Sequence, residues 1–280
     1  MLKKIFAVTL LLVAMLTVGC GGEKKSPPKP EKVTVGVITH LNASEEEYNA
    51  LMLKLEKSYR PSKANISMNF KYFNNINEMQ MALESGQIDM ISVYQCVADY
   101  MINRNPQLQI LKSERVLSDS FCFAVREGDS ILRNDLNRAI SSMMSDGTLA
   151  KLSKQYIIDL KGTEEPPAVE IEQIPDADTV KVAVTGDLPP FDLVLSDGKP
   201  AGFSTAVLAE ISKRIGKNIE LVNIDSDARA SALTSKIADV VFWVSVPKDS
   251  TLVPANIDTP AGIAISEPYY SDSIVHVEKK

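Results

Sequence analysis

Residues 182–203 read VAVTGDLPPFDLVLSDGKPAGF, and they set the pattern that the rest of the chain repeats. They begin within a β-rich apolar run, 180–184, pass through a turn rich in Gly and Pro, and lead into the segment 204–215. In that segment apolar residues recur on one helical face, and Gly216 stands where a left-handed cap would end a helix. The stretch therefore predicts a strand, a loop and an amphipathic helix in succession.

The same alternation of strands and helices runs through both halves of the chain. The predicted strands are 33–39, 66–73, 89–93, 180–184, 219–222 and 240–244, and the predicted helices are 45–59, 77–85, 204–215 and 227–235. Between the halves, residues 161–178 contain Gly and several Pro with little periodicity, which indicates a linker. Alternating strands and helices predict an α/β fold with a mostly parallel sheet in each half.

A weak internal repeat relates the two halves. Residues 82–91 align without gaps with residues 232–241, and in both segments a helix ends, an Asp follows and an apolar strand begins. Together with the matching order of elements, the repeat favours two related α/β lobes. Ligands in such sheets bind beyond the carboxyl ends of the strands, so two facing lobes predict closure around a small solute.

The first nineteen residues predict an export signal. Lys3 and Lys4 precede the apolar run 5–18, which is shorter than the about 20 residues that a permanent membrane span needs. Gly19 and Cys20 follow, and the polar stretch 20–32, rich in Gly and Pro, is expected to act as a flexible tether. The arrangement resembles a bacterial lipoprotein signal, in which Cys20 becomes the lipidated N-terminus. The alternative is an ordinary secretory leader with a chance cysteine.

The composition indicates a globular protein without a nucleic-acid partner. Hydrophobic residues make up 45% of the chain and charged residues 24%, and the formal net charge of −6 lacks the clustered Lys and Arg that phosphate binding requires. Cys96 and Cys122 lie in apolar surroundings, so two buried free thiols are expected before a disulfide, and a metal pair last. His40 and His276 have no ligand-type neighbour at metal spacing, and neither a metal nor a cofactor is expected.

Several blocks of this sequence resemble one family. Residues 186–191, 196–199, 202–203 and 265–270 look like the first lobe and departing hinge strand of the family 3 extracellular solute-binding proteins, the amino-acid receptors of ABC importers. Residues 83–89 resemble their second lobe, 121–130 the returning hinge strand, and 146–156 the closing helix. The resemblance implies a two-lobed periplasmic-binding-protein-like (type II) fold with a hinge.

The order of these blocks implies a circular permutation of the lobes. In the family, lobe one comes first and the closing helix last. Here the second-lobe equivalent is 33–120, the hinge strand and closing helix are 121–160, the linker is 161–178, the first-lobe equivalent is 179–263, and the other hinge strand is 264–280. A single permuted receptor requires residues 121–126 and 269–277 to be neighbouring strands. Two incomplete copies fused in tandem are the alternative.

The resemblance also implies that two charged ligand anchors are missing. The family clamps a ligand carboxylate with an Arg after the strand equivalent to 240–244, where this chain has Lys248 as its only cation. The family's Asp for the ligand ammonium is replaced by Tyr94. Replacement ligand contacts are expected from a stacking Trp243, from aromatic walls and from polar groups, and purely structural roles are the alternative for each. These candidates are Trp243, Phe191, Tyr94, Asp187, Arg229, Ser245, Thr39 and Asn42.

The sequence thus predicts a monomeric solute receptor anchored by lipid on the extracytoplasmic face of the cell membrane. It would capture an amino-acid-like or flat heterocyclic solute and deliver it to an ABC permease. A sensor for a signalling partner is the second hypothesis. A dehydratase-type enzyme on the same fold is the third, although no nucleophile and base stand at a recognisable spacing and no catalytic residue is assigned.

Overall fold

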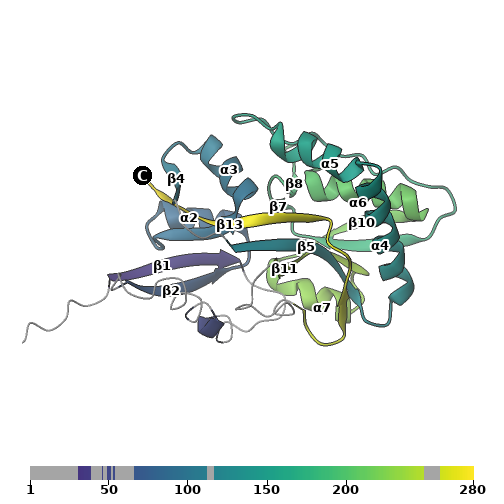
Figure 1. The fold of residues 1–280 in the computed structure, drawn as a ribbon, viewed down its shortest axis with the longest axis horizontal. Helices are drawn as coiled ribbons and strands as arrows, with labels where there is room; N and C mark the ends of the chain where they lie inside the picture. The colour runs from purple at the N-terminus through teal and green to yellow at the C-terminus, as the bar shows by residue number, and fades with distance from the viewer. Residues whose placement is uncertain are drawn as a thin grey trace, which may run out of the picture.

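The structure is a computed structural model that describes residues 31–38, 46, 49–51, 53, 66–111, 117–248 and 259–280. These residues form one ten-stranded mixed sheet in the order β10-β6-β11-β5-β13-β3-β1-β2, with β12 paired to β5 and β4 to β13. A small second sheet has the order β7-β8-β9. Helices α3, α4, α5 and α6 lie on one side of the long sheet in Figure 1, and α7 lies on the other.

The N-terminal half of the chain builds one α/β lobe. Its elements are β1 (Glu31–Ile38), β2 (Ile66–Phe73), α2 (Ile76–Glu84), β3 (Met90–Tyr94), α3 (Gln95–Arg104) and β4 (Leu108–Leu111). Strand β1 is parallel to both β2 and β3. Most of the predicted helix 45–59 lies outside the described residues, although residues 46, 49–51 and 53 are helical. The expected parallel arrangement is confirmed here.

The C-terminal half forms the other α/β lobe, which we call the C-terminal lobe, and in it strands and helices alternate in a similar order. Its elements are β6 (Thr179–Val184), β7 (Asp187–Leu188), β8 (Asp192–Val194), β9 (Pro200–Ala201), α6 (Phe203–Ile215), β10 (Asn218–Asn223), η2 (Ser226–Ala228), α7 (Arg229–Thr234), β11 (Val240–Lys248) and β12 (Ile263–Ile265). Strand β6 is parallel to β10 and β11. Gly216 ends α6 with φ 65°, the left-handed cap that the sequence predicts.

Two long strands join the lobes. Strand β5 (Leu117–Arg126) pairs antiparallel with β11 of one lobe, and β13 (Tyr270–Lys279) pairs antiparallel with β3 of the other. The two strands also pair with each other, with Phe121 opposite Tyr270 and Asp119 opposite Asp272. We call this pair the junction. The two segments that the sequence assigns to the hinge are therefore neighbours.

Three helical segments and the linker complete the outer layer of the C-terminal lobe. They are α4 (Ser130–Ser145), α5 (Thr148–Ser153) and the single π-helical turn η1 (Lys154–Ile158). The predicted linker 161–178 contains neither helix nor strand apart from an isolated bridge between Ala168 and Ala201. In it, the Val169 N–H donates to the Pro200 carbonyl at 2.8 Å, so the linker runs along the small sheet.

The main hydrophobic core crosses from one lobe to the other. It includes Val97 of α3, Phe121 of the junction and Val207 of α6, all buried, whereas a smaller core under α7 contains Leu233 and Val241. Cys96 and Cys122 are both buried free thiols, as expected. Among the described residues, no helix combines the length and the apolar character that crossing a membrane requires. Because one core serves both lobes, they are packed together as well as connected.

Candidate functional site

The lobes touch where β7 and η2 of the C-terminal lobe meet the start of α2. The Asp187 carboxylate accepts a hydrogen bond from the Ile76 N–H at 3.0 Å, and the Ser226 N–H donates to the Asn74 carbonyl at 3.3 Å. The first N–H groups of a helix lack intrahelical partners and carry partial positive charge, so a carboxylate is stabilised there. Burial raises the pKa of Asp187, and the Ile76 bond opposes that rise. Asp187 thus caps a helix of the opposite lobe.

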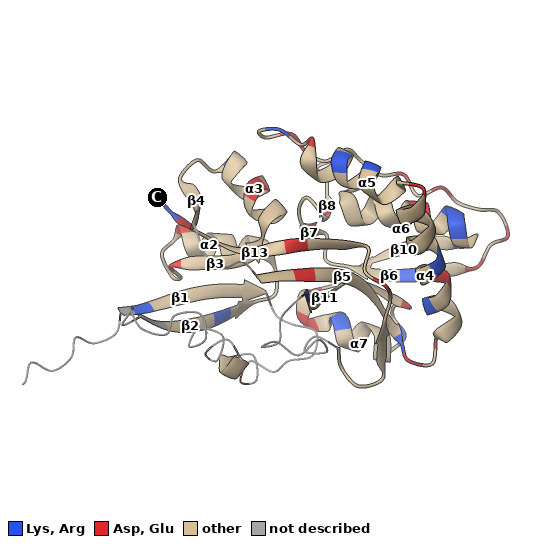
Figure 2. Ribbon diagram, viewed as in Figure 1, with Lys and Arg blue, Asp and Glu red and all other residues tan. Residues whose placement is uncertain are grey.

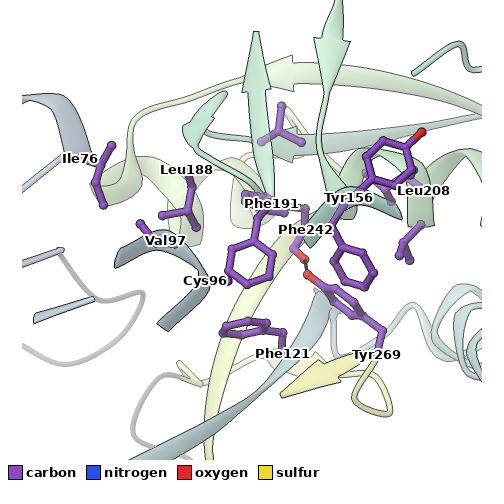
Figure 3. Packing of buried hydrophobic residues seen from close by; sticks show 14 of the residues in the cluster. Ile76, Cys96, Val97, Phe121, Tyr156, Leu188, Phe191, Leu208, Phe242 and Tyr269 are labelled. Carbon is purple, nitrogen blue, oxygen red and sulfur yellow. Dashed lines mark hydrogen bonds between the residues drawn. The ribbon is translucent and has the colours of Figure 1, made fainter. Parts of the chain in front are cut away.

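Phe191 and Tyr94, two of the predicted aromatic walls, belong to one aromatic cluster at the junction. Figure 3 shows Phe191 close to Phe121 in this cluster. Phe191 is 2% exposed and meets Phe121 edge-on with ring centroids 4.8 Å apart. Tyr94 meets the same Phe121 ring at 4.6 Å, and its hydroxyl donates to the Asp119 carboxylate at 2.9 Å. Tyr270 stacks on Phe121 at 5.7 Å. These rings pack the two lobes against each other around Phe121.

The loop that carries Asp187 and Phe191 is held by buried polar contacts. The Phe203 and Ser204 N–H groups at the start of α6 donate to the carbonyls of Pro190 and Phe191, at 2.9 and 2.7 Å. The Asp192 carboxylate accepts from the Gly186 N–H at 2.6 Å, and burial raises the pKa of Asp192 to about 7. These bonds satisfy the α6 N-terminus and fix the loop against it.

The opposite face of the junction carries hydroxyl groups. Side chains alternate along a strand, so the serines between the aromatic and acidic residues of β5 and β13 point the other way. Ser120 Oγ lies 3.0 Å from Ser271 Oγ, and Ser118 Oγ lies 3.5 Å from Ser273 Oγ. Lys248 of β11 stands opposite Ser118 in the register. We call the four serines the hydroxyl ladder; it offers donors and acceptors to a polar solute.

The remaining predicted contacts that the structure describes lie in the C-terminal lobe. Arg229 is 1% exposed, and its Nε donates to the Ser226 carbonyl at 3.0 Å. Ser245 is buried opposite Phe121. Trp243 belongs to β11 at the point where the ladder to β5 is irregular, between Val241 and Val244. The Trp243 side chain and the residues Thr39 and Asn42 lie outside the described part of the chain.

The structure therefore brings Phe191, Tyr94 and Asp187 together at the contact between the lobes. Sequence reasoning missed the hydroxyl ladder and the partner of Asp187. The alternation Ser-Asp-Ser occurs in both junction strands and is visible in the sequence, at 118–120 and 271–273. Its meaning depends on the pairing of two strands about 150 residues apart, since Ser120 and Ser271 are separated by 151 positions.

A family match covers part of the C-terminal lobe. Residues 180–249 match the model of the bacterial extracellular solute-binding proteins, family 3. This segment is similar to the family 3 solute-binding proteins. It runs from β6 to the end of β11, about a quarter of the chain, and contains Asp187, Phe191 and Trp243. No curated protein matches the chain.

Solved structures of similar shape include binding proteins and a regulator. The ligand-binding component of an ABC-type import system from Staphylococcus aureus has a TM-score of 0.47 and 12% identity over 89% of this chain and 66% of its own. The GluR0 ligand-binding core from Nostoc punctiforme, in complex with L-glutamate, has a TM-score of 0.40 and 13% identity over 90% and 85%. CbnR, a LysR family transcriptional regulator, has a TM-score of 0.42 and 14% identity over 89% of this chain and 64% of its own. This chain thus spans just under two thirds of the length of the Staphylococcus aureus protein and of CbnR. At TM-scores below 0.5, these similarities do not indicate a function.

Proposed function

We propose that this protein is an extracytoplasmic receptor that captures a small polar solute between its two lobes. The family match of residues 180–249 is the observation that carries the proposal. Two α/β lobes joined by the paired strands β5 and β13 support it, because small-molecule sites occur preferentially where two such units meet. Delivery of the solute to an ABC permease is part of the proposal. Presentation of the solute to a signalling partner is the alternative. A pull-down from solubilised membranes would distinguish the two by showing whether a permease or a signalling protein binds the receptor.

The receptor is proposed to be circularly permuted, with the linker 161–178 joining what would be the two ends of an unpermuted chain. The pairing of Phe121 with Tyr270 supports this, because it makes one junction from segments on either side of the linker. In a tandem fusion of two incomplete copies, each copy would need a complementary lobe of its own. The shared core across the junction favours one receptor over that alternative.

Trp243 is proposed to stack on a flat or weakly charged solute, with Ser245, Thr39, Asn42 and Arg229 as polar contacts. Phe191 and Tyr94 would support this site from behind, since each packs against Phe121. Asp187 would close the lobes through its bond to α2. A solute with both an ammonium and a carboxylate would lack two charge-assisted contacts, each worth about 1.5–3 kcal/mol, so free amino acids are expected to bind weakly.

A thermal-shift screen of amino acids, nucleobases and dicarboxylates tests this proposal. A bound solute at about 100 times its Kd should add roughly 2.7 kcal/mol to the free energy of unfolding. Trp243→Ala should abolish that gain with little change in the unliganded protein, whereas Trp243→Phe, which keeps an aromatic face, should retain part of it. Micromolar binding of an ordinary amino acid that survives Trp243→Ala would contradict the proposed site.

The receptor is proposed to be anchored to the membrane by lipid on Cys20, because Gly19 and Cys20 directly follow a short apolar run. Cys20→Ser should release the protein from membranes or leave the leader uncleaved, as seen by fractionation and by mass. Cys96→Ser is the matched control, since Cys96 is a buried free thiol and should not change the anchoring. Unchanged membrane retention and mass in Cys20→Ser would rule out this anchor.

A further inference from the structure

A cavity of about 460 Å³ lies between the lobes on the aromatic face of the junction. Its first wall is one face of α3, its second is the segment from η1 into the linker, and its floor is formed by Pro190, Tyr270 and Asp272. Among the predicted ligand contacts whose side chains the structure describes, none lines it. The volume is within the range of about 300–1,000 Å³ that is typical of small-molecule sites.

The described lining of the cavity carries two carboxylates and one guanidinium, and the guanidinium already has partners. Asp99 and Asp272 face the cavity together with Arg104, and Figure 2 shows the acidic positions on α3 and β13 in red. Arg104 donates to the carbonyls of Thr163 and Glu164, forms an ion pair with Glu165 at 3.4 Å and lies over the Tyr100 ring at 3.3 Å. An anion entering the cavity would therefore compete with existing partners of Arg104.

The two carboxylates differ in how far they are satisfied. Asp272 accepts from the Cys96 N–H at 3.0 Å and from the Ser273 N–H at 2.7 Å, so it neutralises the N-terminus of α3. Asp99 accepts from Gln95 Nε2 at 2.9 Å. Burial raises the pKa of Asp99, repulsion from Asp272 adds to the rise, and the Gln95 bond opposes it. A cation beside Asp99 would relieve the repulsion between the two carboxylates.

The opposite wall is apolar. Ile157, Ile158 and Leu160 face the cavity, and Ile158 is 68% exposed. An exposed isoleucine at the mouth of a cavity gains from contact with an apolar group, at about 25 cal/mol for each Å² of apolar surface removed from water. The cavity thus offers negative charge on one side and apolar surface on the other.

We propose that this cavity binds a small organic cation, with its ammonium group against Asp99 and Asp272 and its apolar body against Ile157 and Ile158. The described residues of the proposed solute site, Ser245 and Arg229, do not line this cavity, and the inference does not depend on the proposed function. Because α3 belongs to one lobe and Pro190 to the other, a bound cation would contact both lobes.

Three probes of one shape and different charge test the site by calorimetry on the mature chain: cyclohexylmethylammonium, cyclohexylmethanol and cyclohexanecarboxylate. The ammonium should bind at least about tenfold more tightly than the alcohol, because the alcohol lacks the charge-assisted contact with the carboxylates. The carboxylate should not bind. Asp99→Asn should weaken the ammonium about tenfold or more and leave the alcohol unchanged. Ile158→Ser should weaken the ammonium and the alcohol to a similar extent.

Asp176→Asn is the control for net charge. Asp176 is exposed in the linker at φ 60°, a conformation that Asn tolerates, so all three affinities should equal those of the wild type. The proposal is overturned if the carboxylate binds as tightly as the ammonium, if Asp99→Asn binds the ammonium like the wild type, or if the ammonium gives no binding at millimolar concentration. Each of these results leaves the Trp243 test of the receptor unaffected.

Discussion

Gly202→Ala should lower the free energy of unfolding by about 3 kcal/mol or more. Gly202 has φ +106°, which L residues rarely adopt, and an added Cβ would lie 2.4 Å from the Phe191 carbonyl oxygen and 2.8 Å from that of Pro190. Both atoms belong to the backbone that accepts the first bonds of α6, so they can move only by breaking those bonds. Urea unfolding followed by circular dichroism measures the loss.

Gly198→Ala separates the cost of backbone conformation from that of the collision. Gly198 also has a positive φ, +82°, but a Cβ there would meet no atom within 4 Å. Its substitution should cost only about 1–2 kcal/mol. If the two variants lose equal stability, the close approach of Gly202 to the Pro190–Phe191 backbone does not hold the loop in place.

Phe191→Ala should lower the free energy of unfolding by about 3–5 kcal/mol, the usual cost of emptying a buried aromatic site. The Phe191 ring touches Phe121 and Tyr270 of the junction and Phe203 of α6, at 4.8, 5.5 and 6.3 Å between centroids. Its loss would remove contacts that both lobes share. Denaturant unfolding gives the free energy, and small-angle scattering would show whether the lobes also separate.

Ile131→Ala is the matched control for removing a large apolar side chain. Ile131 is 77% exposed at the start of α4, so its truncation should change stability by no more than about 0.5 kcal/mol. A Phe191→Ala protein as stable as Ile131→Ala would show that the aromatic cluster does not join the lobes.

Most elements could be predicted from the sequence because their signals are local. Residues 66–73 were predicted as a strand and form β2 over the same residues, and the helix predicted to end before Gly216 does so. Helix α3 was missed because its start has no local signal. Tyr94 is both the last residue of β3 and the N-cap of α3, and it makes no side-chain capping bond. The cap comes from Asp272, whose carboxylate accepts from Cys96 across 176 positions.

The candidate site was harder to predict because its contacts are between lobes. The motif around Asp187 indicated a ligand-binding turn, and no sequence pattern shows that its carboxylate reaches Ile76, 111 residues earlier. Similarly, the aromatic character of Phe191 and Tyr94 was visible in the sequence, but their shared contact with Phe121 depends on how β5 and β13 pair. The sequence shows that these side chains are aromatic, and the pairing of the two junction strands determines which residues they contact.

Native mass spectrometry of the mature protein, after incubation with a concentrated metabolite extract and buffer exchange, tests the receptor proposal most directly. The account predicts a complex of one protein with one small polar molecule, which Trp243→Ala no longer retains and Asp99→Asn still does. A wild-type protein that carries only its unliganded mass after every extract, while its fold is intact by circular dichroism, would contradict a solute receptor.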